Sequence, residues 1–413
     1  EFASLPDLIT LGRELEARFQ QLAQVTEGLP GQFWLQERYR EQLGLHLDGL
    51  AEKLGSVAVG RVALVVSDPY LREGSDVSLV LEMRNEALLT GVLESHAQRA
   101  LAEHPGATTS RVDLAGRNVT VLRSADGALS RYQTTAGTLM LLSNSPGGMK
   151  RLLGVQDGTV ARLSTEPDYR FARARAPWND KESAFLFFGD QLMAQLTSPR
   201  AKILEARRVQ AQVELQTVDW SALLFGWMQG RPPASQQELL DSPWLNPKDL
   251  KHFDGKPITW TPEGGAQSAW GSAFNLVPIV DQPLELVTSD EKNAYENFAR
   301  DYESGWRRGL DPTLVRIVRS DNGRKLGFDL DVFPLTAMWG SNSDYRKLDE
   351  VTGGGRVLPG PLTSGLAFTL AFGKDSPLRH LMESSIMGFR GRGDLDLGFL
   401  GAWGQAGLSD RPE

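Results

Sequence analysis

The chain has 413 residues, of which 41% are hydrophobic and 23% charged, and its formal net charge is −8. This size and composition are typical of a folded protein of roughly two or three domains, and the acidic balance argues against nucleic acid as a partner. The absence of cysteine excludes disulfides, zinc–thiolate sites, iron–sulfur clusters and a cysteine nucleophile. The sequence contains no transmembrane segment, because uncharged stretches such as residues 264–280, which include Gln267, Asn275 and Pro278, are too polar to span a bilayer.

Four segments differ in the period of their hydrophobic residues. Residues 1–55 are predicted to form a helical hairpin, since apolar residues recur at helical spacing on both sides of Gly28. Residues 56–156 are predicted to form a first α+β unit, in which Asn85 caps one helix, Ala115-Gly116 forms the turn between two strands, and Ser145-Pro146 opens another helix. Residues 157–255 are predicted to be mainly helical, with a long helix that begins at Pro199. Residues 256–413 are predicted to form a second α+β unit, which includes a strand at residues 366–372.

Residues 286–335 are predicted to form a capped helix followed by a β-hairpin. Thr288 and Glu291 have the spacing of a capping box, in which each side chain accepts a hydrogen bond from a backbone N–H at the helix start. Tyr295, Phe298 and Tyr302 follow at helical steps and share one face. Strands are predicted at residues 314–319 and 325–333, with the turn at residues 321–323.

Two parts of the chain share a local order of elements. A strand, a Ser-Pro pair and a helix follow one another at residues 139–153 and again at residues 370–382. This order favours two diverged copies of one α+β unit, although repeated α+β layers also produce it by chance. The predicted fold class is therefore α+β, with two units of mostly antiparallel sheet and helices, plus N-terminal and central helical segments.

Two longer stretches carry a resemblance to known sequences. They are VALVVSDPYLREGSDVSLVLE at residues 62–82 and YENFARDYESGW followed by DPTLVRI within residues 295–317, with PL at 334–335 and DYRKL at 344–348. The chain resembles a family of uncharacterised bacterial proteins that contain a domain of unknown function and are typically exported and tethered at the cell envelope. The resemblance implies an extracytoplasmic location, in the periplasm or at the cell surface, and supplies no active-site residues.

Two features of the chain itself bear on that location. An extracytoplasmic protein in an oxidising environment has reason to avoid stray thiols, and this chain has none. The chain begins with Glu-Phe and not with methionine, so we expect a processed product or a fragment of a longer protein.

The sequence offers few candidates for catalysis. The five histidines have no metal-ligand spacing, no Gly-x-Ser-x-Gly motif is present, and no glycine-rich loop has the order that binds phosphate. We therefore expect neither a metal nor a cofactor. Two carboxylate pairs are candidates for a general acid and base, Asp329 with Asp331 and Asp394 with Asp396. For the first pair, a solvated strand face is the alternative interpretation.

Tryptophan is concentrated in the middle of the chain. Five of the ten tryptophans fall within residues 220–270, namely Trp220, Trp227, Trp244, Trp260 and Trp270. Tryptophan buries a large apolar area and serves both cores and interfaces. These residues therefore either pack the helical segment against the second α+β unit or form an exposed aromatic platform for a glycan or a partner protein.

Three functions are compatible with these patterns. The first is a non-enzymatic, extracytoplasmic binding or structural module of the bacterial cell envelope, with an envelope protein or glycan bound at the five tryptophans. The second is a hydrolase of an envelope polymer, which requires the four aspartates to converge across a cleft. The third is a carrier of a hydrophobic ligand, which requires an enclosed apolar cavity. The sequence favours the first function and does not determine the oligomeric state.

Overall fold

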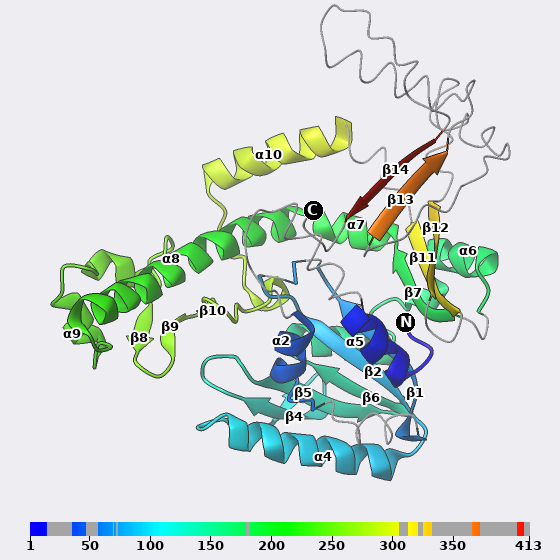
Figure 1. Ribbon diagram of the computed structural model, residues 1–413, viewed down its shortest axis with the longest axis horizontal. Coiled ribbons are helices and arrows are strands. Elements are labelled where there is room, and N and C mark those ends of the chain that lie inside the picture. Colours follow the sequence, from blue (N-terminus) through cyan, green and yellow to red (C-terminus); the bar gives the residue numbers. More distant parts are fainter. Residues whose placement is uncertain are drawn as a thin grey trace, which may run out of the picture. The chain divides into compact units, whose positions relative to one another are not determined.

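The structure, a computed structural model, describes residues 1–14, 35–46, 57–68, 70–71, 73–178, 182–304, 313–320, 325–332, 366–371 and 403–408 (Figure 1). The chain divides into two compact units, the first made of Glu1–Glu16 and Pro30–Asp331 and the second of Ala17–Leu29 and Val332–Glu413. The described residues form helices and antiparallel sheets, so the predicted α+β class is confirmed.

A six-stranded sheet is the largest sheet of the first unit, with strand order β1-β2-β6-β5-β4-β3 and antiparallel pairing throughout. Its strands are β1 (Val59–Val66), β2 (Val77–Met83), β3 (Thr108–Leu114), β4 (Arg117–Arg123), β5 (Ser130–Ala136) and β6 (Leu139–Ser143). The predicted turn between β3 and β4 is confirmed, because Ala115 and Gly116 both have positive φ angles, 53° and 74°. Two such residues form the hairpin turn whose twist matches that of the flanking strands.

Helices pack against both faces of this sheet. Leu89 and Leu93 of α4 (Glu86–Glu103) pack in one cluster with Met140 of β6, whereas Met149 of α5 (Pro146–Asp157) packs with the neighbouring Leu141. Neighbouring residues of a strand point to opposite faces, so α4 and α5 cover opposite faces of the sheet.

Both predicted helix caps of this unit are confirmed. The side chain of Asn85 accepts a hydrogen bond from the backbone N–H of Leu88 at 3.0 Å, and the hydroxyl oxygen of Ser145 accepts one from Gly148 at 3.0 Å. Each cap satisfies a backbone N–H that has no partner within its own helix.

A long helix, α8 (Pro199–Gln229), organises the centre of the chain, as the sequence predicts. The hydroxyl of Ser198 caps its start by accepting from the N–H of Ala201, and Gly230 ends it in the left-handed conformation with φ of 70°. It follows α2 (Leu35–Gln42), α6 (Pro167–Arg175), β7 (Glu182–Phe188) and α7 (Asp190–Leu196) in the order of the chain.

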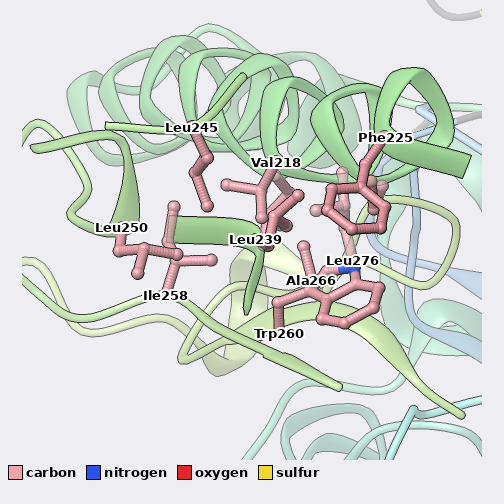
Figure 2. Packing of buried hydrophobic residues seen from close by; sticks show 12 residues of the cluster. Val218, Phe225, Leu239, Leu245, Leu250, Ile258, Trp260, Ala266 and Leu276 are labelled. Atoms are coloured by element: carbon pink, nitrogen blue, oxygen red, sulfur yellow. The ribbon is translucent and has the colours of Figure 1, made fainter. Parts of the chain in front are cut away.

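Several short elements pack together against one face of α8. They are α9 (Gln236–Leu240), the 3₁₀ helices Pro247–Leu250 and Ile279–Asp281, and a three-stranded sheet of β8 (Thr259–Thr261), β9 (Gly265–Ser268) and β10 (Gly271–Ser272). Figure 2 shows Val218 and Phe225 of α8 directed toward Leu239, Ile258 and Trp260 in this core.

The predicted capped helix after residue 286 and the two predicted strands that follow it are also present, whereas the predicted turn at residues 321–323 lies outside the described residues. Thr288 donates its backbone N–H to the carboxylate of Glu291 at 2.8 Å, and its hydroxyl oxygen accepts from the N–H of Glu291 at 3.2 Å, at the start of α10 (Ser289–Ser304). Strands β11 (Thr313–Ser320) and β12 (Lys325–Val332) form a three-stranded sheet with β7. Strand β7 comes from the segment predicted to be mainly helical, so the pairing joins parts of two predicted segments.

In the second unit, β13 (Leu366–Ala371) pairs antiparallel with β14 (Trp403–Leu408). The strand predicted near residue 366 is thus confirmed. The helix predicted after Ser376-Pro377 lies outside the described residues, and so does the turn of the predicted N-terminal hairpin. The proposed duplication and the four-segment division therefore stay predictions.

Candidate functional site

Helix α8 is apolar on two opposite sides. One side packs into the core and is formed by Ala201, Leu204, Ala211, Leu215, Val218, Ala222 and Phe225, all buried. The opposite side carries Val209, Val213, Gln216, Trp220, Leu223 and Trp227, which we call the outer seam. A rotation of about 100° per residue places the outer seam about 180° away from the buried side.

The outer seam is exposed apolar surface. Val209 and Val213 are 45% and 57% exposed, and Trp220, Leu223 and Trp227 are 64%, 63% and 84% exposed. Exposed Leu224 and Met228 widen the seam near the end of the helix. Isolated exposed apolar residues are ordinary in proteins, but five of them along roughly 27 Å of one helix face, interrupted only by Gln216, are typical of an interaction surface.

No basic residue lies on α8 between Arg208 and the end of the helix, and the two acidic residues there, Glu214 and Asp219, bind other parts of the chain. A carboxylate oxygen of Glu214 lies 2.6 Å from Nδ1 of buried His252, and Oδ1 of Asp219 accepts the backbone N–H of Ala266 at 2.8 Å. Burial raises the pKa of Asp219, and this hydrogen bond partly opposes the shift. The outer seam is therefore flanked mainly by neutral side chains.

Buried polar contacts fasten the first half of α8 to the β1–β2 connection. The guanidinium of Arg208 is fully buried and donates to the carbonyl oxygen of Gly74 and to the carboxylate of Glu205. Nζ of Lys202 donates to the hydroxyl of Tyr70 at 3.0 Å. Because charged hydrogen bonds of this kind are costly to break when buried, they stabilise the contact between α8 and the β1–β2 connection.

Helix α10 contacts α8 ahead of the outer seam. Arg207 forms an ion pair with Glu291 at 2.6 Å, and the hydroxyl of Tyr295 donates to the carbonyl oxygen of Thr197 at 3.1 Å. The ammonium of Lys202 lies 4.7 Å from the centre of the Phe298 ring. Lys202 is one heptad before Val209, so α10 contacts the same side of α8 that carries the seam farther along.

The five tryptophans named from the sequence fall into two groups. Trp220 and Trp227 lie on the outer seam, whereas Trp260 and Trp270 are 7% and 2% exposed and belong to two core clusters. Trp244 is partly buried and packs against the same cluster as Trp260. The structure brings two of the five together at the surface. Val209, Val213 and Leu223 complete the seam. Together with Gln216 and the two tryptophans they follow one another at alternating steps of four and three in the sequence, a pattern that a search for tryptophan alone misses.

The carboxylate pairs named from the sequence have no described catalytic arrangement. Asp329 lies on β12, exposed, and accepts two hydrogen bonds from the guanidinium of Arg316 on β11 at 3.0 and 2.8 Å. This contact is a cross-strand ion pair on a solvated face. The side chain of Asp331 and all of Asp394 and Asp396 lie outside the described residues, so the hydrolase hypothesis stays a prediction.

A buried polar cluster at the β1–β2 connection was not identified from the sequence. The backbone N–H and the hydroxyl of Ser67 both donate to Oδ1 of Asp76, and the hydroxyl of Ser75 donates to Asp68. Burial raises the pKa of Asp76 to about 6, with the hydrogen bonds from Ser67 opposing the shift. The signal for this cluster is the repeated Ser-Asp pair on either side of Gly74.

The polar residues next to this cluster form hydrogen bonds with one another and lie close to the start of α5. The hydroxyl of Ser78 donates to that of Ser143 at 2.8 Å, and the side chain of Asn144 accepts the N–H of Val77 at 2.7 Å. A methyl group on Gly148 would lie 2.8 Å from the Ser143 hydroxyl oxygen. The cluster thus pairs buried polar groups with one another, which stabilises the connection.

Neither a metal site nor a membrane span is found in the described part of the chain. None of its His, Asp and Glu side chains gather in a group of three that could hold a metal ion. None of its helices combines the length and the apolar character needed to cross a bilayer.

Comparisons with protein-family models, with curated proteins and with solved structures found no match to this chain. Its function is therefore inferred from the chemistry of its own surfaces, among which the outer seam of α8 stands out.

Proposed function

We propose that the chain is a non-enzymatic, extracytoplasmic binding or structural module of the bacterial cell envelope, and that it binds a partner protein through the outer seam of α8. The observation that carries the proposal is the exposure of Trp220, Leu223 and Trp227 on a helix whose opposite side is already buried. Tryptophan is enriched among the few residues that provide most of the binding energy at protein interfaces.

The composition of the seam favours a protein over a membrane surface or a glycan. Helices that lie on anionic membranes are rich in Lys and Arg, and α8 has neither beyond Arg208. A glycan site needs several converging polar groups to bind hydroxyls, whereas Gln216 is the one polar residue of the seam among valine, leucine and tryptophan. Apolar residues at alternating steps of four and three are the pattern that packs one helix against another.

The proposed location rests on the absence of cysteine and on the resemblance to exported envelope proteins. Protease treatment of intact spheroplasts of the native host, followed by detection of an epitope-tagged chain, tests it. An extracytoplasmic chain is cleaved while a cytoplasmic marker survives. Protection of the chain until the membrane is lysed would refute the location.

Site-specific photo-cross-linking in the native host tests the binding surface. A photoreactive amino acid at Leu223 is compared with one at Gln98, which is exposed on α4. We expect discrete adducts from position 223, none of the same mass from position 98, and their loss when Trp227→Glu is added. Equal labelling from both positions would show that the seam is ordinary surface.

A further inference from the structure

The outer seam follows the heptad pattern of a coiled coil. Val213, Trp220 and Trp227 are seven residues apart, and Val209, Gln216 and Leu223 are also seven apart, offset by three or four from the first set. They correspond to positions a and d, the positions that face a partner helix. The f positions, Ala211, Val218 and Phe225, are buried in this chain's own core. A second helix can therefore approach without competing with the core.

The two halves of the seam are unequal in size and complement each other. The first half carries the smaller Val209, Val213 and Gln216, and the second half carries Trp220, Leu223 and Trp227. A parallel, in-register copy would stack tryptophan on tryptophan and valine on valine, which gives overfilled and underfilled layers. A reversed copy pairs the small half with the large half, so every layer has a similar volume.

We propose that the partner is a second copy of this chain, with the two α8 helices antiparallel and a twofold axis at the level of Val218. This inference rests on the proposed function and names its partner. A residue that lies a given number of positions before Val218 pairs with the partner residue that lies the same number of positions after it. Val213 is therefore opposite Leu223 of the partner subunit, and Val209 is opposite the partner's Trp227. The same residue pairs recur on both sides of the axis, as a twofold interface requires.

The polar residue of the seam also fits this arrangement. Gln216 lies opposite Trp220 of the partner subunit, where the side-chain oxygen of Gln216 accepts the indole N–H of that tryptophan. Buried indole N–H groups require such an acceptor, and a glutamine at a core position is costly without a partner. One pairing gives the indole N–H its acceptor and the glutamine oxygen its donor in each of two layers.

Helix α10 favours the antiparallel over the parallel arrangement. It contacts α8 at Lys202 and Arg207, within the stretch that a parallel second helix would need. An antiparallel partner helix reaches its own end near this level, because α8 stops at Gly230. Leu286, which is 81% exposed, accepts a hydrogen bond from Arg207 through its carbonyl oxygen and offers apolar surface near that end.

The flanking charges are compatible with self-association. Complementary charges at positions e and g normally select a different partner chain. Here those positions hold Gln210, Thr217, Leu224, Gln212, Asp219 and Gly226. Asp219 is the one charged residue among them and accepts a hydrogen bond from Ala266. The residues that flank the seam therefore carry no charges that would select a different partner chain. Two copies also bring few like charges together at the seam, although the net charge of the chain is −8.

The absence of cysteine permits a direct test of orientation. Val213→Cys and Leu223→Cys are made in separate full-length chains of different tag size and oxidised alone and as an equimolar mixture. We expect a disulfide-linked heterodimer in the mixture and at least about tenfold less cross-linking of either variant alone. Cross-linking of each variant with itself, and not in the mixture, would overturn the antiparallel arrangement.

Sedimentation of the full chain tests the second copy itself. We expect a concentration-dependent dimer, and a dimer dissociation constant raised at least about tenfold by Leu223→Glu. Phe274→Glu is the matched control, because Phe274 is 77% exposed but lies off α8, and it should leave the constant unchanged. A monomer at every concentration tested would overturn the proposal.

The photo-cross-linking experiment separates this outcome from failure of the proposed function. If the chain is monomeric and position 223 captures another protein whose binding is lost in Trp227→Glu, the seam is a binding surface and the second copy is the wrong partner. If the chain is monomeric and position 223 captures nothing beyond the control, both proposals fall.

Discussion

Val218 and Trp220 are two residues apart on α8, yet Val218 is 0% exposed and Trp220 is 64% exposed. The helical rotation of about 200° between them places one in the core and the other in the outer seam. Substitutions on the buried side of α8 should therefore lower the stability of the fold, whereas substitutions in the outer seam should weaken binding.

The first prediction concerns the two sides of α8. Phe225→Ala should lower the free energy of unfolding by about 3–5 kcal/mol, because it leaves a cavity in the core shown in Figure 2. Trp227→Ala removes a larger side chain but should change the free energy of unfolding of the monomer by less than about 0.5 kcal/mol. Urea unfolding at low protein concentration measures both. Similar losses for the two variants would mean that Trp227 is packed within the same chain.

The second prediction is a pH dependence that comes from Asp76, whose pKa burial raises from 3.8 to about 6. Between these values the folded state holds a proton that the unfolded state has lost, so stability falls as pH rises from about 4 to 6 and then levels off. The full effect is at most about 3 kcal/mol.

Asp76→Asn isolates this contribution, because its side-chain oxygen can still accept from Ser67 and no longer titrates. The difference in unfolding free energy between Asp76→Asn and the wild type should grow in favour of the variant from pH 4 to 6. A constant difference across this range would show that Asp76 titrates normally.

The third prediction concerns Glu214, which fastens α8 to the loop that follows Leu250. Its carboxylate contacts Nδ1 of His252 at 2.6 Å and accepts the backbone N–H of Phe253 at 3.2 Å. Glu214→Ala leaves these donors without a partner and should cost about 2–3 kcal/mol in thermal or urea unfolding. Gln98→Ala, at an exposed position on α4 away from Glu214, is the control and should be nearly neutral. A neutral Glu214→Ala would mean that water replaces the carboxylate.

The fourth prediction compares two glycines with positive φ angles. Gly74 has φ of +133°, and a methyl group there would lie 2.8 Å from the carbonyl oxygen of Leu276, whereas Gly137 has φ of +61° with open space around it. Gly137→Ala should cost about 1–2 kcal/mol from backbone strain alone. Gly74→Ala should cost more, because the backbone near Leu276 must also move. Equal losses, measured as shifts in the urea midpoint, would argue against this close approach.

Local features of the fold were well predicted from the sequence. The caps at Asn85, Ser145 and Thr288 and the turn at Gly116 depend on residues within four positions of one another, so their spacing in the sequence is sufficient to identify them. The start of α8 at Pro199 is another such feature.

Features that depend on distant contacts were not determined by the sequence. The apolar residues of α8 lie on two sides, and only the packing of residues 236–276 decides which side is buried. The same packing buries Trp260 and leaves Trp220 and Trp227 exposed. The pairing of β7 with β11 and the burial that raises the pKa of Asp76 likewise depend on contacts between residues far apart in the sequence. Hydrophobic period and capping are set by neighbours in the chain, whereas exposure and desolvation are set by residues that only the tertiary structure brings together.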